Sequence, residues 1–242
     1  MNRLPLLDSE AWDRFPDPRQ ALTEPNGLLA FGGDLSPRRL LAAYSLGIFP
    51  WFGEHEPILW WSPDPRCVFH TETLRINRSL RRQLRGKTWR LSADHAFEQV
   101  VRACAAPRAR EAGTWLVPAM IDAYVQLHRL GHAHSVEVWD GERLVGGIYG
   151  VAVGRLFCGE SMFSAESGGS KLALVALARL LHEMGFPLLD TQVANPHTLG
   201  LGAVEMPRAE FLRQVAQLTR TPGLVGSWAA FTPRLIQPGA DH

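Results

Sequence analysis

The chain has 242 residues, of which 46% are apolar and 20% charged, and its formal net charge is +1. This length suits one large domain or two small ones, and the near-neutral charge means that any affinity for nucleic acid must come from a local patch. No uncharged apolar run approaches the roughly 18 residues of a membrane span, and acidic residues near the start argue against a signal peptide. The three widely spaced cysteines, Cys67, Cys104 and Cys158, indicate reduced thiols and no zinc motif.

The first 70 residues are rich in turn signals and tryptophan. Prolines 5, 16, 18 and 25 predict an irregular start. Ser36 is a helix N-cap by type and Pro37 suits the first helical position, so a short helix should cover residues 38–45 and end at Gly47. Three tryptophans lie within residues 51–61, and such rings suit core packing as well as stacking on bases.

A basic stretch follows at residues 73–90. Its positive side chains fall at helical spacing and no acidic residue after Glu72 offsets them, so the stretch is either a solvated helix face or a surface for a phosphate backbone. The residues that we assign to this predicted tRNA-binding face are Arg78, Arg81, Arg82, Arg85 and Lys87.

The middle of the chain predicts two helices and a strand. Asp94 is a candidate N-cap for a helix through Cys104, a second helix should cover 118–130, and residues 134–138 alternate as a strand before a hairpin turn at 140–141. His128, His132 and His134 straddle a helix end and a strand start. No carboxylate or cysteine completes a metal site there, so we expect no bound metal.

The segment from Leu144 to Ala203 predicts the part around which the rest is arranged. It contains strands at 144–153, 156–163 and 188–193 and a helix capped by Ser170 and stopped at Gly185. A last helix should cover 208–218. Asp190 and Gln192 are two residues apart on one strand, so their side chains share a face.

Polar residues in an apolar strand are costly, at about 1–3 kcal/mol for each unpaired buried group. Asp190 and Gln192 raise this question, together with Asn195 just beyond them and Glu160 on the preceding strand. One interpretation is that these groups satisfy one another and cap loops. The other is a polar cluster at the mouth of a sheet, inside an apolar pocket.

Long motifs in this sequence carry a resemblance to a known family. They are EPNGLLAFGGDLSPRRLLAAYSLGIFPWF, WWSPDPR, residues 111–115, LGHAHSVEVW, LVGGIYGVA, LFCGESMFS and LLDTQVANPHTLGLGA. In this order they cover roughly residues 20–215, and together they resemble the bacterial leucyl/phenylalanyl-tRNA–protein transferases.

The resemblance implies an aminoacyltransferase without a cofactor. Such an enzyme takes leucine or phenylalanine, and less readily methionine, from aminoacyl-tRNA to the N-terminal arginine or lysine of an acceptor protein and so marks that protein for degradation. It also implies an α+β fold in a cytoplasmic protein, with a small N-terminal α/β domain (1–70) followed by a GNAT-like, acetyltransferase-like catalytic domain (71–242).

The resemblance also suggests roles for the polar cluster. Aminolysis of an ester needs a neutral amine, proton removal, a stabilised oxyanion and aligned partners. We expect Asp190 to polarise Gln192, which would hold the attacking amine, and Asn195 to hold a carbonyl or ribose group. Glu160 would bind either the aminoacyl ammonium or the basic side chain of the acceptor.

The leucine or phenylalanine side chain needs an apolar pocket. The candidates for it on the strands and helix around the cluster are Ile148, Phe157, Met162, Leu174 and Leu181. For the terminal adenosine we expect three rings, Trp51, Trp115 and Tyr124, to serve by stacking and hydrogen bonding.

Three other functions compete with this one. An acyl-CoA N-acyltransferase would bind pyrophosphate in the Gly-rich loop 165–170, where Glu166 would repel it. An RNA-binding module would explain the basic stretch but not the polar cluster. A thiol route through Cys158 has no histidine beside it in sequence.

Overall fold

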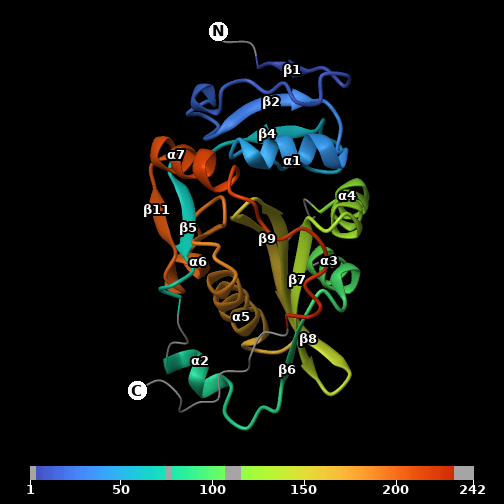
Figure 1. Ribbon diagram of the computed structural model, residues 1–242, viewed down its shortest axis with the longest axis vertical. Coiled ribbons are helices and arrows are strands. Elements are labelled where there is room, and N and C mark those ends of the chain that lie inside the picture. Colours follow the sequence, from blue (N-terminus) through green and yellow to red (C-terminus); the bar gives the residue numbers. More distant parts are fainter. Residues whose placement is uncertain (1–3, 75–77, 107–115, 232–242) are drawn as a thin grey trace.

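The computed structural model describes residues 4–74, 78–106 and 116–231. The first part of the chain forms a small sheet, drawn in blue to teal at the top of Figure 1, with strand order β1-β2-β4-β3. Strand β2 (Leu28–Gly32) pairs in parallel with β1 (Leu6–Leu7) and antiparallel with β4 (Leu59–Trp61), which also pairs with β3 (Phe49–Pro50). A 3-10 turn (Pro18–Gln20) precedes β2, and helix α1 (Pro37–Ser45) follows it.

The large sheet has seven strands in the order β11-β5-β10-β9-β8-β7-β6. All neighbours run antiparallel except β9 and β10, which are parallel. Its strands are β5 (Arg66–His70), β6 (Arg90–Ala93), β7 (Ala133–Asp140), β8 (Arg143–Val153), β9 (Leu156–Ser164), β10 (Leu188–Asp190) and β11 (Val204–Met206).

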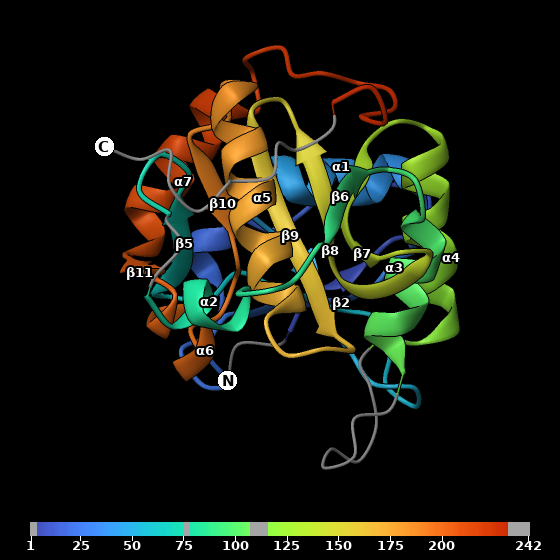
Figure 2. The ribbon, with the colours of Figure 1, turned by 90° about the horizontal axis from the view of Figure 1, so that it is seen from below.

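Helices cover both faces of the large sheet. On β8, Tyr149 and Val151 pack into one core with α3 (Phe97–Ala105) and α4 (Pro118–Arg129), whereas Ile148 and Ala152 pack into another with α5 (Gly169–Glu183). Because successive strand residues point to opposite faces, α5 lies on one face and α3 and α4 on the other. Figure 2 shows α5 in front of β9, with α3 and α4 to its right. The remaining helices are α2 (Arg78–Gln83), α6 (Pro196–Gly200) and α7 (Arg208–Leu218).

The small and large sheets share one core. Leu29 and Trp60 of the small sheet belong to the same buried cluster as Tyr149 and Phe211. Strand β5 includes the last residues of the predicted first domain (1–70) and pairs into the large sheet. The two sheets are therefore joined through packing, and the last residues of the predicted first domain, Arg66–His70, belong to the large sheet.

Several predicted elements are confirmed. The helix after Pro37, the strands at 144–153 and 156–163 and the helix at 208–218 appear within a residue or two of their expected bounds. The mixed α+β class is confirmed as well. These are the elements with the strongest apolar periodicity or the clearest end signals.

The strand predicted at 188–193 is too long by three residues. Strand β10 ends at Asp190, because Gln192 adopts a positive φ of 57°, a conformation that a strand cannot continue. The expectation that Asp190 and Gln192 alternate regularly on one strand is therefore wrong.

Two predicted N-caps are also wrong. Ala96 stands at the N-cap of α3, while the Asp94 carboxylate accepts backbone N–H bonds from Ser135 (3.0 Å) and Trp228 (2.7 Å). Gly168, with φ 96°, is the N-cap of α5 instead of Ser170. Its positive φ suits glycine, which has no Cβ to clash.

Candidate active site

The site lies in a gap beside strand β9. Strand β10 pairs with β9 only over Leu156–Cys158, whereas β9 continues to Ser164 with β8 as its partner on the other side. Beyond Cys158, the edge of β9 that faces β10 therefore has no strand partner among the described residues. Glu160 stands on this stretch, and the chain that leaves β10 passes opposite it.

Glu160 is held by donors from three separate parts of the chain. The Tyr44 hydroxyl of α1 donates to Oε1 at 2.9 Å, the Tyr124 hydroxyl of α4 donates to Oε2 at 2.5 Å, and the Gln192 amide Nε2 donates to Oε1 at 3.1 Å. The two tyrosine oxygens are 3.1 Å apart. The network thus joins the small sheet's helix to the large sheet and fixes the carboxyl group in the gap.

Burial is the main influence on the protonation of Glu160. It raises the pKa of this carboxyl to about 7, with the nearby Asp190 charge also raising it, while the hydrogen bonds from Tyr124 and Tyr44 and the charge of Arg66 lower it. Burial likewise raises the pKa of both tyrosines well above its usual value. The tyrosine hydroxyls therefore stay protonated and donate hydrogen bonds at neutral pH, whereas the Glu160 carboxyl group gains or loses its proton in that pH range.

Asp190 is paired with Arg66 in the interior. The Arg66 guanidinium donates from Nε to Oδ1 at 2.8 Å and from Nη2 to Oδ2 at 2.7 Å, and both side chains are almost completely buried. Arg66 also donates to the Gly47 carbonyl at 3.0 Å and lies between the Phe49 and Phe211 rings. Such a bidentate pair is geometrically demanding, so it fixes the end of β10.

Asp190 reaches Gln192 through the backbone. The Gln192 N–H donates to Asp190 Oδ1 at 2.9 Å, and the Gln192 carbonyl accepts from the Cys67 N–H at 3.0 Å. The expected polarisation of the Gln192 side chain by Asp190 is not what the structure has. Asp190 instead holds the backbone of Gln192 in its left-handed conformation, and the Gln192 amide turns toward Glu160.

Asn195 caps helix α6. Its Oδ1 accepts N–H bonds from His197 and Thr198, both at 2.9 Å, and Thr198 Oγ1 accepts from the Asn195 N–H at 3.2 Å. In this capping box, the side-chain oxygen of Asn195 is already occupied by two backbone N–H donors. Only its amide nitrogen is left for a substrate.

Two pockets meet at this cluster. One has a volume of about 500 Å³ and is lined by Trp51, Phe49, several prolines, Asn26 and Glu205. The other, of about 830 Å³, is lined by apolar and polar residues in similar number, and the large apolar ones on β8, β9 and α5 are Ile148, Met162, Phe163 and Leu174. Four residues line both pockets: Glu160, Thr191, Gln192 and Asn195.

The structure brings together part of the predicted apolar pocket. Ile148, Met162 and Leu174 line the larger cavity. Phe157 and Leu181 do not line either pocket; they are fully buried in the core that α5 forms with the sheet. Their assignment to the substrate pocket is therefore corrected, because in this position they serve as core.

The three predicted rings differ in their positions. Trp51 is 47% exposed and lines the smaller pocket. The ring of Tyr124 is fully buried against Tyr149, with centroids 5.3 Å apart, so it has no free face on which a base could stack. Its hydroxyl contacts Glu160 instead. Trp115 lies outside the described residues.

Sequence reasoning missed Arg66 and Tyr44. Arg66 ends the WWSPDPR motif and begins the apolar strand β5, and a charge next to a buried strand was the available signal for a buried partner. Tyr44 lies on a short helix whose apolar face showed nothing unusual. Its link to Glu160, 116 positions later, has no local signal.

The basic stretch is less regular than predicted. Helix α2 covers only Arg78–Gln83, and Arg85 and Lys87 follow it; all five assigned basic side chains are exposed. Lys87 forms an ion pair with Glu166 at 2.7 Å. The expectation that no acidic residue offsets the stretch is therefore wrong for Lys87, because the fold brings in Glu166 from the loop before α5.

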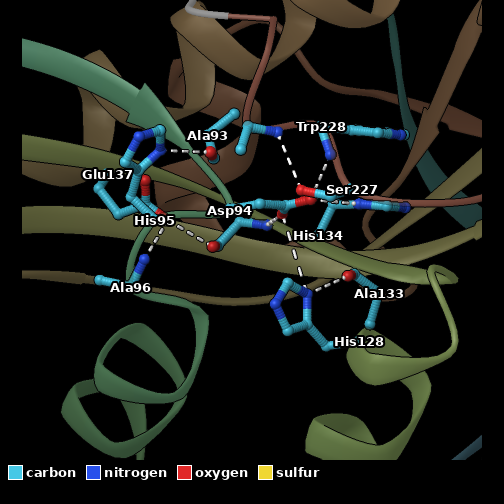
Figure 3. Close-up of polar contacts among 12 residues, drawn as sticks. Ala93, Asp94, His95, Ala96, His128, Ala133, His134, Glu137, Ser227 and Trp228 are labelled. Carbon is cyan, nitrogen blue, oxygen red and sulfur yellow. Dashed lines mark hydrogen bonds and ion pairs between the residues drawn. The ribbon is translucent and has the colours of Figure 1, made fainter.

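Two of the three predicted histidines, His128 and His134, lie in a separate cluster around Asp94 (Figure 3). His134 contacts Asp94 at 2.9 Å and stacks on Trp228 with centroids 3.7 Å apart. The His128 Nδ1 lies 2.8 Å from the Ala133 carbonyl. Among residues 4–74, 78–106 and 116–231, no group of three or more His, Cys, Asp or Glu is arranged to hold a metal ion.

Two of the competing functions meet structural obstacles. Cys158 is buried, and burial raises the pKa of its thiol well above the usual value, which disfavours the thiolate that a thiol route needs. In the Gly-rich loop, the Gly169 N–H donates to the Glu166 carbonyl at 3.0 Å and the Ser170 N–H to Ser164 Oγ at 2.7 Å. Those two amides are not free to bind a pyrophosphate.

No helix within the described part of the chain combines the length and the apolar character that crossing a bilayer requires.

Two family models match this sequence. The model of the leucyl/phenylalanyl-tRNA protein transferase matches residues 68–216, and that of its N-terminal domain matches residues 33–64. A leucyl/phenylalanyl-tRNA–protein transferase from Xanthomonas axonopodis pv. citri is 61% identical over 93% of this chain and 90% of its own. The one from Shewanella baltica is 50% identical over 94% of this chain and 96% of its own.

One solved structure matches at much lower sequence identity. A conserved protein of unknown function from Bacteroides thetaiotaomicron matches with a TM-score of 0.43 at 11% identity, over 67% of this chain and 57% of that chain. The family of this chain therefore rests on its sequence relatives and not on structural likeness.

Proposed function

The chain belongs to the leucyl/phenylalanyl-tRNA protein transferase family, and we propose that it transfers leucine or phenylalanine from aminoacyl-tRNA to the N-terminal arginine or lysine of acceptor proteins. The product is a new peptide bond and an altered N-terminus that marks the acceptor for degradation. Methionine is a poorer donor in this proposal. We include in it a GNAT-like catalytic domain (71–242) after an N-terminal domain (1–70), joined through strand β5.

The observation that carries this proposal is the meeting of two pockets at Glu160 and Gln192. Aminolysis of an activated ester needs no enzyme nucleophile, but it needs the two substrates to be held in reacting geometry. Two cavities that share four lining residues provide such a place. The shared residues offer an amide donor and a carboxyl group at the point where the aminoacyl ester and the acceptor's amine would meet.

The larger pocket suits the donor's side chain. Ile148, Met162 and Leu174 present apolar surface, and about 830 Å³ accommodates leucine and phenylalanine alike. An apolar pocket discriminates by only about 10- to 200-fold for a methylene group. A preference for several large apolar residues, without strict selection of one, is therefore expected.

The smaller pocket suits the terminal adenosine of the tRNA at its rim and the N-terminal residue of the acceptor protein deeper inside. The half-exposed face of Trp51 is available for stacking on a base. Glu205 and Glu160 both line this cavity, and a carboxylate attracts a guanidinium or an ammonium group. A basic N-terminal residue would therefore be favoured there over an uncharged one.

We assign the chemistry to Gln192 and the amide nitrogen of Asn195, with Asp190 as a positioning residue. Gln192 is held by its backbone on both sides, so its amide is in place before the substrate arrives. A preorganised donor of this kind stabilises the oxyanion or orients the amine. Asp190 lines neither pocket and acts through the backbone of Gln192.

The basic residues of α2 and the turn after it bind the tRNA backbone in this proposal. Reversing the charge of Arg81 and Arg82 to glutamate should weaken aminoacyl-tRNA binding. The slope of the logarithm of the binding constant against that of salt concentration should become shallower by about 0.7–0.9 for each phosphate that the protein no longer neutralises. Filter binding between about 50 and 200 mM salt would measure this slope.

Arg213 offers a matched control for this experiment. It is exposed on α7, and α7 lies at the opposite end of the large sheet from α2 in Figure 1. Arg213→Glu changes the net charge in the same direction but should leave the salt slope as it is. If the double reversal at α2 also leaves the slope unchanged, tRNA binds elsewhere on the surface.

Transfer itself can be tested with one labelled donor and two acceptors. tRNA charged with labelled leucine is incubated with the protein and a peptide that begins with arginine, and in parallel with one that begins with alanine. We expect the label to move to the first peptide and not to the second. Label that stays on the tRNA in both reactions would refute the proposed function.

A further inference from the structure

We propose that Glu160 accepts the proton which the acceptor's α-ammonium group must lose before it attacks the ester. This inference rests on the proposed function and adds the route of the proton to it. The reasons lie in the position of Glu160, in the state of its oxygens and in the poorer placement of the other carboxylates.

Position is the first reason. Of the four residues that line both pockets, Glu160 is the only one with an ionisable side chain. A base must come within hydrogen-bond reach of the proton that it takes. A group at the junction of the two cavities lies where the amine and the ester meet in the proposed arrangement.

The oxygens of Glu160 leave room for one more donor. Among the described residues, Oε1 accepts from Tyr44 and Gln192, whereas Oε2 accepts only from Tyr124. A carboxylate oxygen has two acceptor sites. Oε2 can therefore take a hydrogen bond from an ammonium group while the network around it stays intact.

The other acidic groups are less suited. Both oxygens of Asp190 are bound by the buried Arg66, and Asp190 lines neither pocket. Glu205 lines only the smaller pocket and is exposed. The Gln192 amide and the neutral tyrosine hydroxyls are not bases at neutral pH.

The energetics of proton transfer favour a partly buried carboxyl group with a raised pKa over an ordinary one. A peptide α-amine has a pKa near 7.7–8.0 and an exposed glutamate near 4.3, a mismatch of more than about 10³-fold. With the pKa of Glu160 raised by burial to about 7, the transfer is disfavoured by only about tenfold. The charged and titratable groups that face it are Tyr44 (α1), Tyr124 (α4), Arg66 (β5), Tyr149 (β8), Cys158 (β9) and Asp190 (β10).

Bonds and protons balance in this reaction. The α-ammonium gives one proton to Glu160, and the neutral amine forms a C–N bond to the ester carbonyl carbon. The tetrahedral intermediate then breaks its C–O bond to the ribose. The second proton on nitrogen goes to the leaving ribose oxygen, and Glu160 returns its proton to water after the product leaves.

Glu160→Gln tests the role of the carboxylate through the pH dependence of the reaction. Single-turnover transfer from Leu-tRNA to an arginine-headed peptide should be slowed by up to about 20-fold at about pH 6.5, because only about one amine in twenty is neutral there. The defect should shrink to less than about twofold at about pH 9, where the amine is already neutral. A variant that keeps the wild-type rate at the lower pH, or whose defect is equal at both pH values, contradicts the proposal.

Tyr124→Phe provides a second test that does not remove the carboxyl group. It deletes a donor that lowers the pKa of Glu160, so the limb on which the wild-type rate rises with pH should move to higher pH. Glu142→Gln, which removes an exposed carboxylate that lines neither pocket, is the control and should leave the midpoint of that limb in place. An unmoved midpoint in Tyr124→Phe would overturn the assignment, whereas a wild-type protein that transfers no leucine would refute the proposed function instead.

Discussion

Arg66→Met is expected to lower the free energy of unfolding by about 3–5 kcal/mol. The side chain of Asp190 is fully buried and both its oxygens are bound by Arg66. Methionine keeps much of the volume between Phe49 and Phe211 but leaves a carboxylate without a partner in the interior. Removing one member of such a pair is costly because the remaining charge cannot reach water.

Urea unfolding monitored by tryptophan fluorescence would measure this loss. Arg102→Ala is the matched control: Arg102 pairs with Glu98 on the surface of α3 at 2.7 Å, and its side chain is 61% exposed. A surface pair of this kind contributes about 0.3–0.5 kcal/mol. If Arg66→Met lay within about 1 kcal/mol of wild type, the buried pair would not hold the end of β10 as we describe.

The sequence predicted the fold best where the signal was local. The helix at 208–218 and the strands of the 144–163 hairpin follow from apolar periodicity and from glycine turns, which act within a few residues. Strand β10 was overextended because its end depends on Asp190, whose partner Arg66 lies 124 positions earlier. A contact between residues so far apart in the sequence produces no periodic pattern from which it could be predicted.

The same distinction holds for the site. Glu160, Gln192 and Asn195 could be selected because polar groups in apolar strands demand partners, and all three line both pockets. Which partners they have could not be predicted. The sequence alone did not show that Tyr124 donates to Glu160 or that Asp190 binds Arg66, because these contacts form between elements that only the fold brings together.

Gln192→Ala should reduce the turnover number by about 10²–10³-fold, while aminoacyl-tRNA binding changes little. The amide of Gln192 lies where the two pockets meet and donates to Glu160 at 3.1 Å, so its removal deletes a fixed donor at the reacting centre. The basic residues of α2 are untouched. Single-turnover transfer and filter binding with the same Leu-tRNA would separate the two quantities.

Gln192→Ala is a cleaner probe than Asp190→Ala. Loss of the Asp190 carboxylate would leave Arg66 buried without its partner, so any fall in activity would combine misfolding with chemistry. At Gln192 the positive φ of 57° strains alanine about as much as glutamine, and the backbone bonds to Asp190 and Cys67 remain. Leu199→Ala, at a 44% exposed position on α6, should keep the wild-type rate. If Gln192→Ala loses tRNA affinity and turnover in equal measure, Gln192 binds the donor in its ground state and has no separate role in the transition state.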